Sequence, residues 1–296
     1  MNCTLKVRDK NLKSSSVKQT DPILSEKTKS FMKANHKDKD IPGMTKEKIM
    51  DFSHFKQSMY DKYRPNKYEL VPYLINDGKK HPFAVICPGG GYGMVCSAGE
   101  GKPFAEKLNK MGYNAFVVYY RVKKKAKYPN PQLDLKRAVE EVFSHKDEWN
   151  LDTDNWSIWG SSAGGHLVAS YCLEDWGTPK PTALILVYPV ISMGEYTHKG
   201  SRDNLLGKNA SEDMIKKLSV EISADENYPP TYMWYGTADD VVHPLNSKML
   251  GDKLSEFGVD FKVEEYEGVG HGAGMATGTV AEAWFNNAVD FWQKQI

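Results

Sequence analysis

A serine set among small residues stands at 160–164, where the chain reads Gly-Ser-Ser-Ala-Gly. This G-x-S-x-G pattern follows an apolar, strand-like run at 156–159 and opens a helical stretch at 163–173. A sharp strand-to-helix turn exposes its central serine as a nucleophile, at a helix N-terminus that favours developing negative charge. The pattern therefore predicts Ser162 as a nucleophile. Ser161, its rival, should point away from the reacting face, and a Gly-Ser turn without chemistry is the plain structural alternative.

A serine hydroxyl is a weak nucleophile at neutral pH and needs a general base that a carboxylate orients. Asp239 follows the strand-like run 231–235, and His271 stands between glycines after the run 261–266. The chain order serine, acid, histidine suits a nucleophile on a strand-to-helix turn. We therefore expect Asp239 to orient His271 as the base. The residues leave further candidates open, namely Asp240 as the acid and His166 or His243 as the base.

A glycine-rich loop, Pro88-Gly-Gly-Gly-Tyr92, follows the early strand-like run 83–87. Backbone N–H groups in such a loop can point at the oxyanion of a tetrahedral intermediate, together with the N–H of the residue after the nucleophile. We expect the amides of Gly90, Gly91 and Ala163 to form this oxyanion hole. The competing interpretation, a phosphate-binding loop, lacks the G-x-G-x-x-G or G-K-[S/T] pattern that it needs.

Residues so far apart need a scaffold that brings their loops together, and the pattern of the chain supplies one. Strand-like runs lie at 68–74, 83–87, 114–120, 156–159, 183–188, 231–235 and 261–266. Helical segments lie at 102–111, 133–145, 163–173, 246–257 and 280–293. This alternation predicts an α/β fold with a mostly parallel central sheet and helices on both faces.

Two segments depart from the alternation. Residues 1–44 are polar and lack a hydrophobic period, so we expect a basic, poorly ordered arm before a domain at 45–296. The first 48 residues carry twelve Lys or Arg against six Asp or Glu, although the whole chain has a net charge of only +1. Such an arm could contact anionic surfaces, with a solvated tail as the alternative. The segment 190–228, which contains a helical stretch at 212–218, is expected to form a cap or lid.

Composition and charge exclude several classes of function. Hydrophobic residues make up 40% of the 296, enough for the core of one large domain. The near-neutral balance gives no sign of nucleic-acid binding, and no apolar run approaches the roughly 20 residues of a membrane span. The N-terminus lacks an apolar signal segment, and the four cysteines lack metal-ligand spacing. We expect a cytoplasmic protein with no metal, organic cofactor, nucleic acid or membrane as partner.

With these motifs in place, the chain from about Tyr68 onward resembles the α/β-hydrolase carbohydrate esterases and acetylesterases of the xylanase-associated group. The motifs that carry the resemblance are Cys87-Pro-Gly-Gly-Gly-Tyr92, Tyr119-Tyr-Arg121, Pro131-Gln-Leu-Asp134, Gly160-Ser-Ser-Ala-Gly-Gly-His166, Tyr188-Pro-Val190, Pro229-Pro-Thr231, Asp239-x-x-Val242 and Gly270-His271-Gly272. The resemblance implies an α/β-hydrolase fold with the triad Ser162, Asp239 and His271. Pro88 stands where related hormone-sensitive-lipase-like enzymes carry the histidine of His-Gly-Gly-Gly, which favours the sugar-ester group.

The resemblance implies a serine esterase that hydrolyses a short acyl ester, an acetyl group foremost, on a sugar or xylo-oligosaccharide. Tyr92, beside the glycine-rich loop, could stack on a sugar ring, with core packing as the alternative. An amidase, formamidase or peptidase would use the same triad. A non-catalytic interaction module is disfavoured, because no member of the triad is missing. The acyl length, the alcohol and the oligomeric state stay open.

Overall fold

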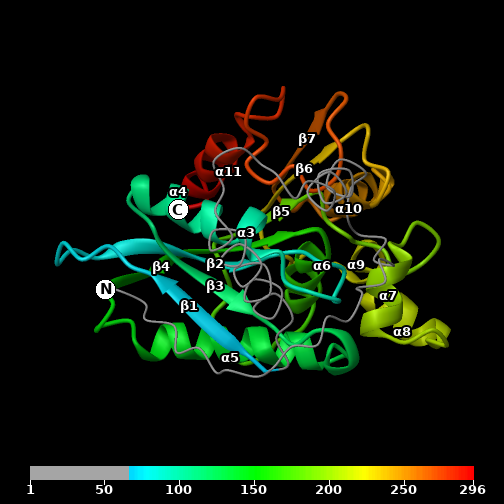
Figure 1. Cartoon of the computed structure of the whole chain (residues 1–296), viewed down its shortest axis with the longest axis horizontal. Coiled ribbons are helices and arrows are strands. Elements are labelled where there is room, and N and C mark those ends of the chain that lie inside the picture. Colours follow the sequence, from blue (N-terminus) through cyan, green and yellow to red (C-terminus); the bar gives the residue numbers. More distant parts are fainter. Residues whose placement is uncertain (1–66) are drawn as a thin grey trace, which may run out of the picture. The chain divides into compact units, whose positions relative to one another are not determined.

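The computed structural model describes residues 67–296. The predicted basic arm, 1–44, lies outside the described residues, as does the start of the predicted domain up to residue 66. Within residues 67–296 a seven-stranded sheet runs in the order β1-β3-β2-β4-β5-β6-β7 (Figure 1). The strands are β1 (Glu69–Tyr73), β2 (His81–Cys87), β3 (Asn114–Tyr119), β4 (Leu151–Ser161), β5 (Ala183–Val187), β6 (Thr231–Gly236) and β7 (Phe261–Tyr266).

The sheet is mostly parallel, as predicted. β1 runs antiparallel to β3, and the other neighbouring pairs run parallel. The inner strands β3 and β5 are buried at every position, whereas the edge strand β7 alternates between half-buried and exposed residues. A parallel strand covered on both faces reads as a continuous apolar run, and an edge strand does not need to. This difference is visible in the sequence of each strand.

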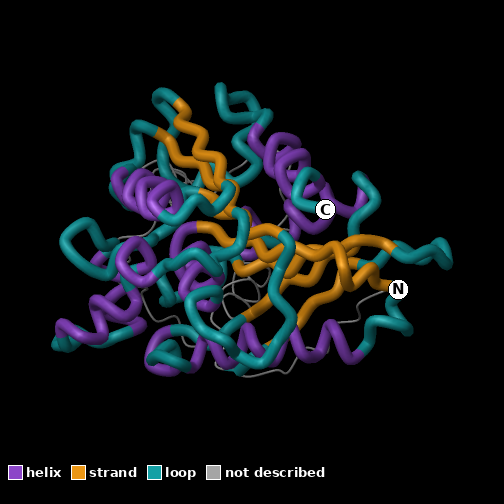
Figure 2. The backbone as a smooth tube through the Cα atoms, turned by 180° about the vertical axis from the view of Figure 1, so that it is seen from behind, coloured by secondary structure: helices purple, strands orange, loops and turns teal. Residues whose placement is uncertain are grey.

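Helices cover both faces of the sheet, which Figure 2 shows as the central layer. α4 (Lys102–Lys110) and α11 (Trp284–Gln293) share one face, where the Phe104 ring meets that of Trp284 edge-on at 5.3 Å between centroids. α5 (Asn130–Ser144) and α6 (Ser162–Tyr171) lie side by side on the other face (Figure 1). The remaining long helix, α10 (Leu245–Glu256), packs against β7. The predicted α/β class is therefore confirmed.

Element boundaries differ from the sequence expectation mainly at the ends. β4 is longer than its predicted run, and α11 begins at Trp284 rather than at 280 because 276–283 form turns. In the segment 190–228, α8 (Glu212–Leu218) matches the predicted bounds. The short helices α3 (Ser97–Glu100), η1 (Lys123–Lys125), α7 (Lys199–Leu205) and α9 (Val220–Ser223) were not predicted. α3, η1 and α9 are single turns, too short to display a 3.6-residue hydrophobic period. α7, with the sequence KGSRDNL, has one large apolar residue and therefore no such period.

Parallel strands deliver their following loops to one edge of the sheet, and this edge collects all the predicted site residues. β2 neighbours β4, with Cys87 opposite Gly160, so the glycine-rich loop emerges beside Ser162. β6 neighbours β7, with Gly236 opposite Tyr266, so the loops carrying Asp239 and His271 also emerge together. The one strand between these two pairs is β5. Its following residue is Tyr188.

Two motif residues form a partly buried ion pair that joins the end of β3 to α5. The Arg121 Nε donates to both carboxylate oxygens of Asp134, at 2.9 and 2.8 Å, and the Arg121 backbone N–H donates to the same carboxylate at 2.9 Å. The Asp134 side chain is only 5% exposed, and the Arg121 side chain 26%. Removing one member would leave the other charge without a partner.

We expect Asp134→Ala to lower the free energy of unfolding by about 3 kcal/mol, because breaking a buried pair leaves an uncompensated charge and an unbonded N–H. Urea unfolding at neutral pH measures the change. Asp147→Ala, which removes an exposed carboxylate just after α5, is the matched control and should change stability by less than about 0.5 kcal/mol. Equal effects of the two substitutions would contradict this role of the pair.

Candidate active site

The turn that carries the predicted nucleophile is strained and tightly packed. Ser162 is the first residue of α6, directly after β4, and its φ of +52° lies in the left-handed region. A Cβ on Gly164 would stand 2.1 Å from the Cys87 carbonyl oxygen, and one on Gly160 would stand 2.3 Å from the Gly164 carbonyl oxygen. Backbone atoms occupy these positions, so only glycine fits at either. The small residues of the motif thus let β4, α6 and the end of β2 approach closely enough to present Ser162.

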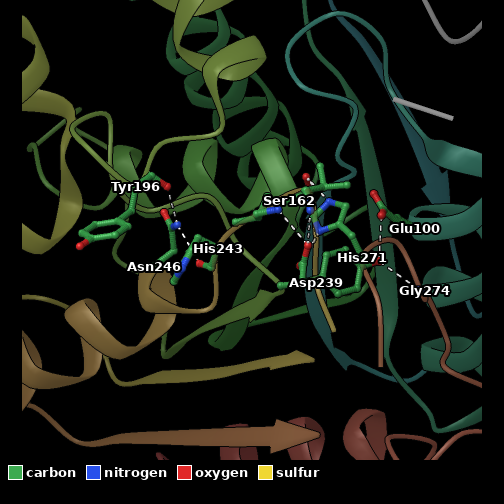
Figure 3. Close-up of polar contacts among 11 residues, drawn as sticks. Glu100, Ser162, Tyr196, Asp239, His243, Asn246, His271 and Gly274 are labelled. Atoms are coloured by element: carbon green, nitrogen blue, oxygen red, sulfur yellow. Dashed lines mark hydrogen bonds and ion pairs between the residues drawn. The ribbon is translucent and has the colours of Figure 1, made fainter. Parts of the chain in front are cut away.

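The three predicted triad residues are joined by hydrogen bonds (Figure 3). The His271 Nδ1 lies 2.7 Å from Asp239 Oδ2, and the His271 Nε2 lies 2.8 Å from Ser162 Oγ. An ionised carboxylate only accepts, so Nδ1 carries the proton and Nε2 is left to accept from the serine hydroxyl. The other Asp239 oxygen accepts the N–H groups of Val241 and Val242, at 3.0 and 2.8 Å. This arrangement suits proton transfer from Ser162 to His271.

The rival residues lie in other surroundings. Asp240 is exposed beside the buried Asp239. His243 is exposed and accepts the Leu245 N–H at its own Nδ1, 3.1 Å away. Ser161 is 1% exposed, and its hydroxyl has no hydrogen-bond partner among the described residues. None of these side chains is hydrogen-bonded to Ser162 in the described stretch of the chain.

His166, the remaining rival, is fully buried on α6 and forms a structural link. Its Nε2 donates to the Leu218 carbonyl at 2.8 Å, and its Nδ1 accepts the Tyr92 hydroxyl at 2.9 Å. Burial lowers the pKa of His166 to about 4, against an ordinary 6.5, while the hydrogen bond to Leu218 acts in the opposite direction. The neutral ring therefore ties the glycine-rich loop and the end of α8 to α6.

The contacts of His166 also settle the position of Tyr92. This side chain is 0% exposed and meets the Tyr120 ring edge-on at 6.0 Å. Its φ of +55° belongs to the turn in the glycine-rich loop, and its side chain packs in the core. The prediction that Tyr92 stacks on a sugar is therefore wrong, and its alternative, core packing, describes the residue.

The glycine-rich loop is held by its carbonyl groups. The Gly90 carbonyl accepts the N–H groups of Gly93 and Met94, and the Gly91 carbonyl accepts the Asn204 side-chain amide at 2.9 Å. Within residues 67–296 the N–H groups of Gly90 and Gly91 donate to no acceptor. A Cβ on Gly89 would stand 2.8 Å from the Ser162 Cβ, so this loop lies directly against Ser162. Unpaired amides at this position can serve a developing oxyanion.

Several residues that complete the site were not singled out from the sequence. The Asn246 Oδ1 accepts the N–H groups of Ile191 and Ser192, at 2.9 and 3.0 Å. Its Nδ2 donates to the carbonyls of Tyr196 and His243, both at 2.9 Å (Figure 3). One buried amide therefore joins the segment 190–228 to the loop that follows Asp239. A lone asparagine at the start of a helical segment carries no sequence signal for this role.

His198 also belongs to the surroundings of the triad. It precedes α7, and its Nδ1 accepts from the Ser201 hydroxyl at 2.8 Å. Burial lowers the pKa of His198, the charge of His271 lowers it further, and the charge of Asp239 raises it. The segment 190–228 therefore brings a second histidine within electrostatic reach of the triad.

The fold and the site together define an α/β hydrolase. Residues 85–275 match the family model described as alpha/beta hydrolase fold, which covers more than half of the chain. The chain belongs to this family, and the resemblance drawn from its motifs is confirmed.

Two curated relatives match most of this chain. An endo-1,4-beta-xylanase B of Butyrivibrio fibrisolvens is 30% identical over 255 residues, which are 79% of this chain and 40% of that protein. An acetylxylan esterase of Xylanibacter ruminicola is 31% identical over 216 residues, which are 71% of this chain and 45% of that protein. The chain thus spans less than half the length of these relatives.

Solved structures share the fold over almost their whole length. An acetyl ester-xyloside bifunctional hydrolase from Caldicellulosiruptor lactoaceticus superposes with a TM-score of 0.71 at 31% identity, covering 77% of this chain and 88% of the other. A sugar hydrolase from Lactococcus lactis gives a TM-score of 0.68 at 25% identity, covering 78% and 95%. Among the helices of residues 67–296, none has the length and apolar character needed to cross a membrane.

We expect Gly164→Ala to destabilise the fold by at least about 3 kcal/mol and to abolish activity, because the added methyl would overlap the Cys87 carbonyl. Thermal unfolding and labelling by a fluorophosphonate probe measure the two effects. Gly99→Ala is the control, since a Cβ there meets no atom within 4 Å. An unchanged melting temperature in Gly164→Ala would contradict the packing argument.

His166 predicts a pH dependence of stability. The unfolded chain takes up a proton at this side chain near pH 6.5, whereas the folded chain does so only near pH 4. Stability should therefore fall as the pH drops through this window, by up to about 3 kcal/mol from this group. Urea unfolding between pH 7 and pH 4 should show a shallower pH dependence in His166→Gln than in the wild type. His243→Gln, at an exposed position, should retain the wild-type slope.

Proposed function

We propose that this chain is a serine esterase that removes a short acyl group, acetyl foremost, from a sugar or xylo-oligosaccharide. The observation that carries the proposal is the hydrogen-bonded series from Asp239 through His271 to Ser162, beside the unpaired amides of the glycine-rich loop. A nucleophile, a base, an orienting carboxylate and an anion site are the four components that acyl transfer requires.

In the proposed reaction, the His271 Nε2 takes the proton of the Ser162 hydroxyl as Oγ attacks the ester carbonyl carbon. The carbonyl oxygen becomes an anion that the amides of Gly90, Gly91 and Ala163 receive. His271 returns the proton to the leaving alcohol, and an acyl-serine remains. Water then attacks the acyl carbon, gives its proton to His271, and releases the acid, after which the proton returns to Ser162. Asp239 holds the His271 tautomer and stabilises the imidazolium throughout.

The proposed substrate class rests on the relatives. One of them is named an acetylxylan esterase, and another is named a bifunctional hydrolase of acetyl esters and xylosides. The triad geometry is equally suited to an amide, a formamide or a peptide bond. The test of the proposal therefore compares these substrates with acetyl esters. A non-catalytic interaction module would have no use for unpaired amides beside a hydrogen-bonded serine.

The segment 190–228 is proposed as a cap that forms one wall of the substrate site. The Asn204 side chain donates a hydrogen bond to the Gly91 carbonyl of the glycine-rich loop. Asn246, which follows the loop after Asp239, accepts a hydrogen bond from the Ile191 N–H at the start of the segment. His198 adds a side chain whose electrostatic neighbours are the triad residues. These contacts support a cap, because they tie the segment to loops on two sides of the nucleophile.

The test compares acetylated xylo-oligosaccharides with nitrophenyl esters of increasing chain length, aryl formamides and short peptides. We expect the acetylated sugars and the shortest nitrophenyl esters to give the highest kcat/KM. Ser162→Ala should reduce each of these activities by at least about 10⁴-fold and should prevent fluorophosphonate labelling, because the nucleophile is lost.

Ser161→Ala is the matched control, since it removes the neighbouring hydroxyl, which has no partner among the described residues. It should retain labelling and turnover. Ester hydrolysis that persists in Ser162→Ala would refute the serine mechanism. A wild type that cleaves formamides or peptides faster than acetyl esters would refute the substrate assignment while leaving the mechanism standing.

A further inference from the structure

A second carboxylate is buried behind the triad. Glu100 is the last residue of α3 and is 6% exposed. Its Oε2 accepts the Gly89 N–H at 2.7 Å, and its Oε1 accepts the Tyr188 hydroxyl at 2.8 Å. Among the described residues no Lys or Arg pairs with it. A buried carboxylate without a basic partner is costly, and such groups are often found at functional sites.

The Tyr188 hydroxyl extends this contact to the loop that carries His271. Its oxygen accepts the Gly274 N–H at 3.0 Å, so Gly89, Glu100, Tyr188 and Gly274 form one hydrogen-bonded series. Glu100 and Gly274 are labelled in Figure 3. A Cβ on Gly274 would stand 2.8 Å from the Gly99 carbonyl, which shows that α3 lies directly against the histidine loop. The series therefore joins the glycine-rich loop to the histidine loop through one carboxylate.

Tyr188 also contacts the triad itself. Its ring meets the His271 ring edge-on, with 4.9 Å between centroids, and its φ of +38° is a strained conformation for a tyrosine. Glu100 accepts the hydrogen bond of the Tyr188 hydroxyl and lies within electrostatic reach of the imidazole. The Gly89 N–H and the Tyr188 O–H both donate to Glu100 oxygens, and an ionised carboxylate can only accept hydrogen bonds.

The pKa of Glu100 is raised from its ordinary value, and burial is the largest cause. The hydrogen bonds from Tyr188 and Gly89 and the charge of His271 act in the opposite direction, so these contacts are what favour the ionised form. The interaction with His271 is reciprocal, so an anion at Glu100 favours the imidazolium that forms when Ser162 gives up its proton.

We propose that Glu100 is a positioning residue for the proposed hydrolase reaction. It sets the glycine-rich loop against the loop that carries His271, and it supports the protonated His271 ring as a second buried anion. This inference rests on the proposed function, because it assigns Glu100 a role only if His271 is the base. Asp239 bonds the ring directly, while Glu100 acts on it through Tyr188 and through space.

The other titratable groups around this pair are few among the described residues. His198 and Asp239 face His271 from the segment 190–228 and from the loop after β6. Cys96 and Tyr120 lie within electrostatic reach of Glu100, and burial raises the pKa of each, so both stay neutral at pH 7. Asp239 and Glu100 are thus the two anions whose removal should change the protonation behaviour of the site.

The test is Glu100→Gln, which removes the charge and keeps the shape. The readout is the rate of fluorophosphonate labelling of Ser162 against pH, which needs no knowledge of the substrate. The acid limb of this profile should move to lower pH by about one unit, because the protonated ring loses an anion that stabilises it. The plateau rate should fall about tenfold, because an amide cannot accept both the Gly89 N–H and the Tyr188 hydroxyl.

Glu106→Gln is the matched control, since Glu106 is an exposed carboxylate on the neighbouring helix α4. Its profile should match the wild type. A Glu100→Gln profile with an unmoved acid limb would overturn the proposal, even if the plateau rate fell, because a merely structural role lowers the rate alone. Labelling that persists in Ser162→Ala, or that is absent from the wild type, would instead mark a failure of the proposed function.

Tyr188→Phe keeps the test decisive if Glu100→Gln does not fold. This variant retains the carboxylate and removes the hydroxyl that joins it to Gly274. We expect the plateau labelling rate to fall about tenfold with the protein still folded by circular dichroism. A wild-type plateau in this variant would overturn the positioning role.

Discussion

The close approach of three backbone segments at the turn that carries Ser162 is the constraint on which the rest of the site depends. The backbone of Gly164 lies against the carbonyls of Cys87 and Pro88, and that of Gly89 lies against the Cβ of Ser162. These contacts leave no room for a side chain. They therefore fix the distances between the end of β2, the end of β4 and the start of α6. That spacing puts the unpaired amides of the glycine-rich loop beside the serine.

Polar groups behind this turn hold the surrounding loops. His166 joins the glycine-rich loop and α8 to α6, and Asn246 joins the segment 190–228 to the loop after Asp239. Glu100, through Tyr188, joins the glycine-rich loop to the loop that carries His271. Each of these side chains is buried, so an unmet hydrogen bond would be costly, and each bonds backbone or side-chain groups of two segments. The loops are therefore positioned by a few buried hydrogen bonds in addition to the sheet.

Much of this arrangement could be predicted from the sequence, because certain residues show their surroundings in the local pattern. β3 and β5 read as continuous apolar runs because helices cover both of their faces, and the glycines at 160 and 164 mark a turn that admits no side chain. Ser162, Asp239 and His271 each follow a recognisable strand, so their common edge follows from parallel topology. Tyr92 shows the limit of such inference, because its place in the glycine-rich loop was visible but the inward direction of its side chain was not.

The sequence by itself thus determined the fold class, the order of the elements and the three residues that meet at the edge of the sheet, because hydrophobic period and glycine placement are local properties. Only the tertiary structure decided which polar side chains support them. Glu100 and Tyr188 are 88 residues apart, and Asn246 lies 55 residues from its partner Ile191. A hydrogen bond across such a separation depends on how the sheet brings loops together, and no local pattern in the chain encodes it.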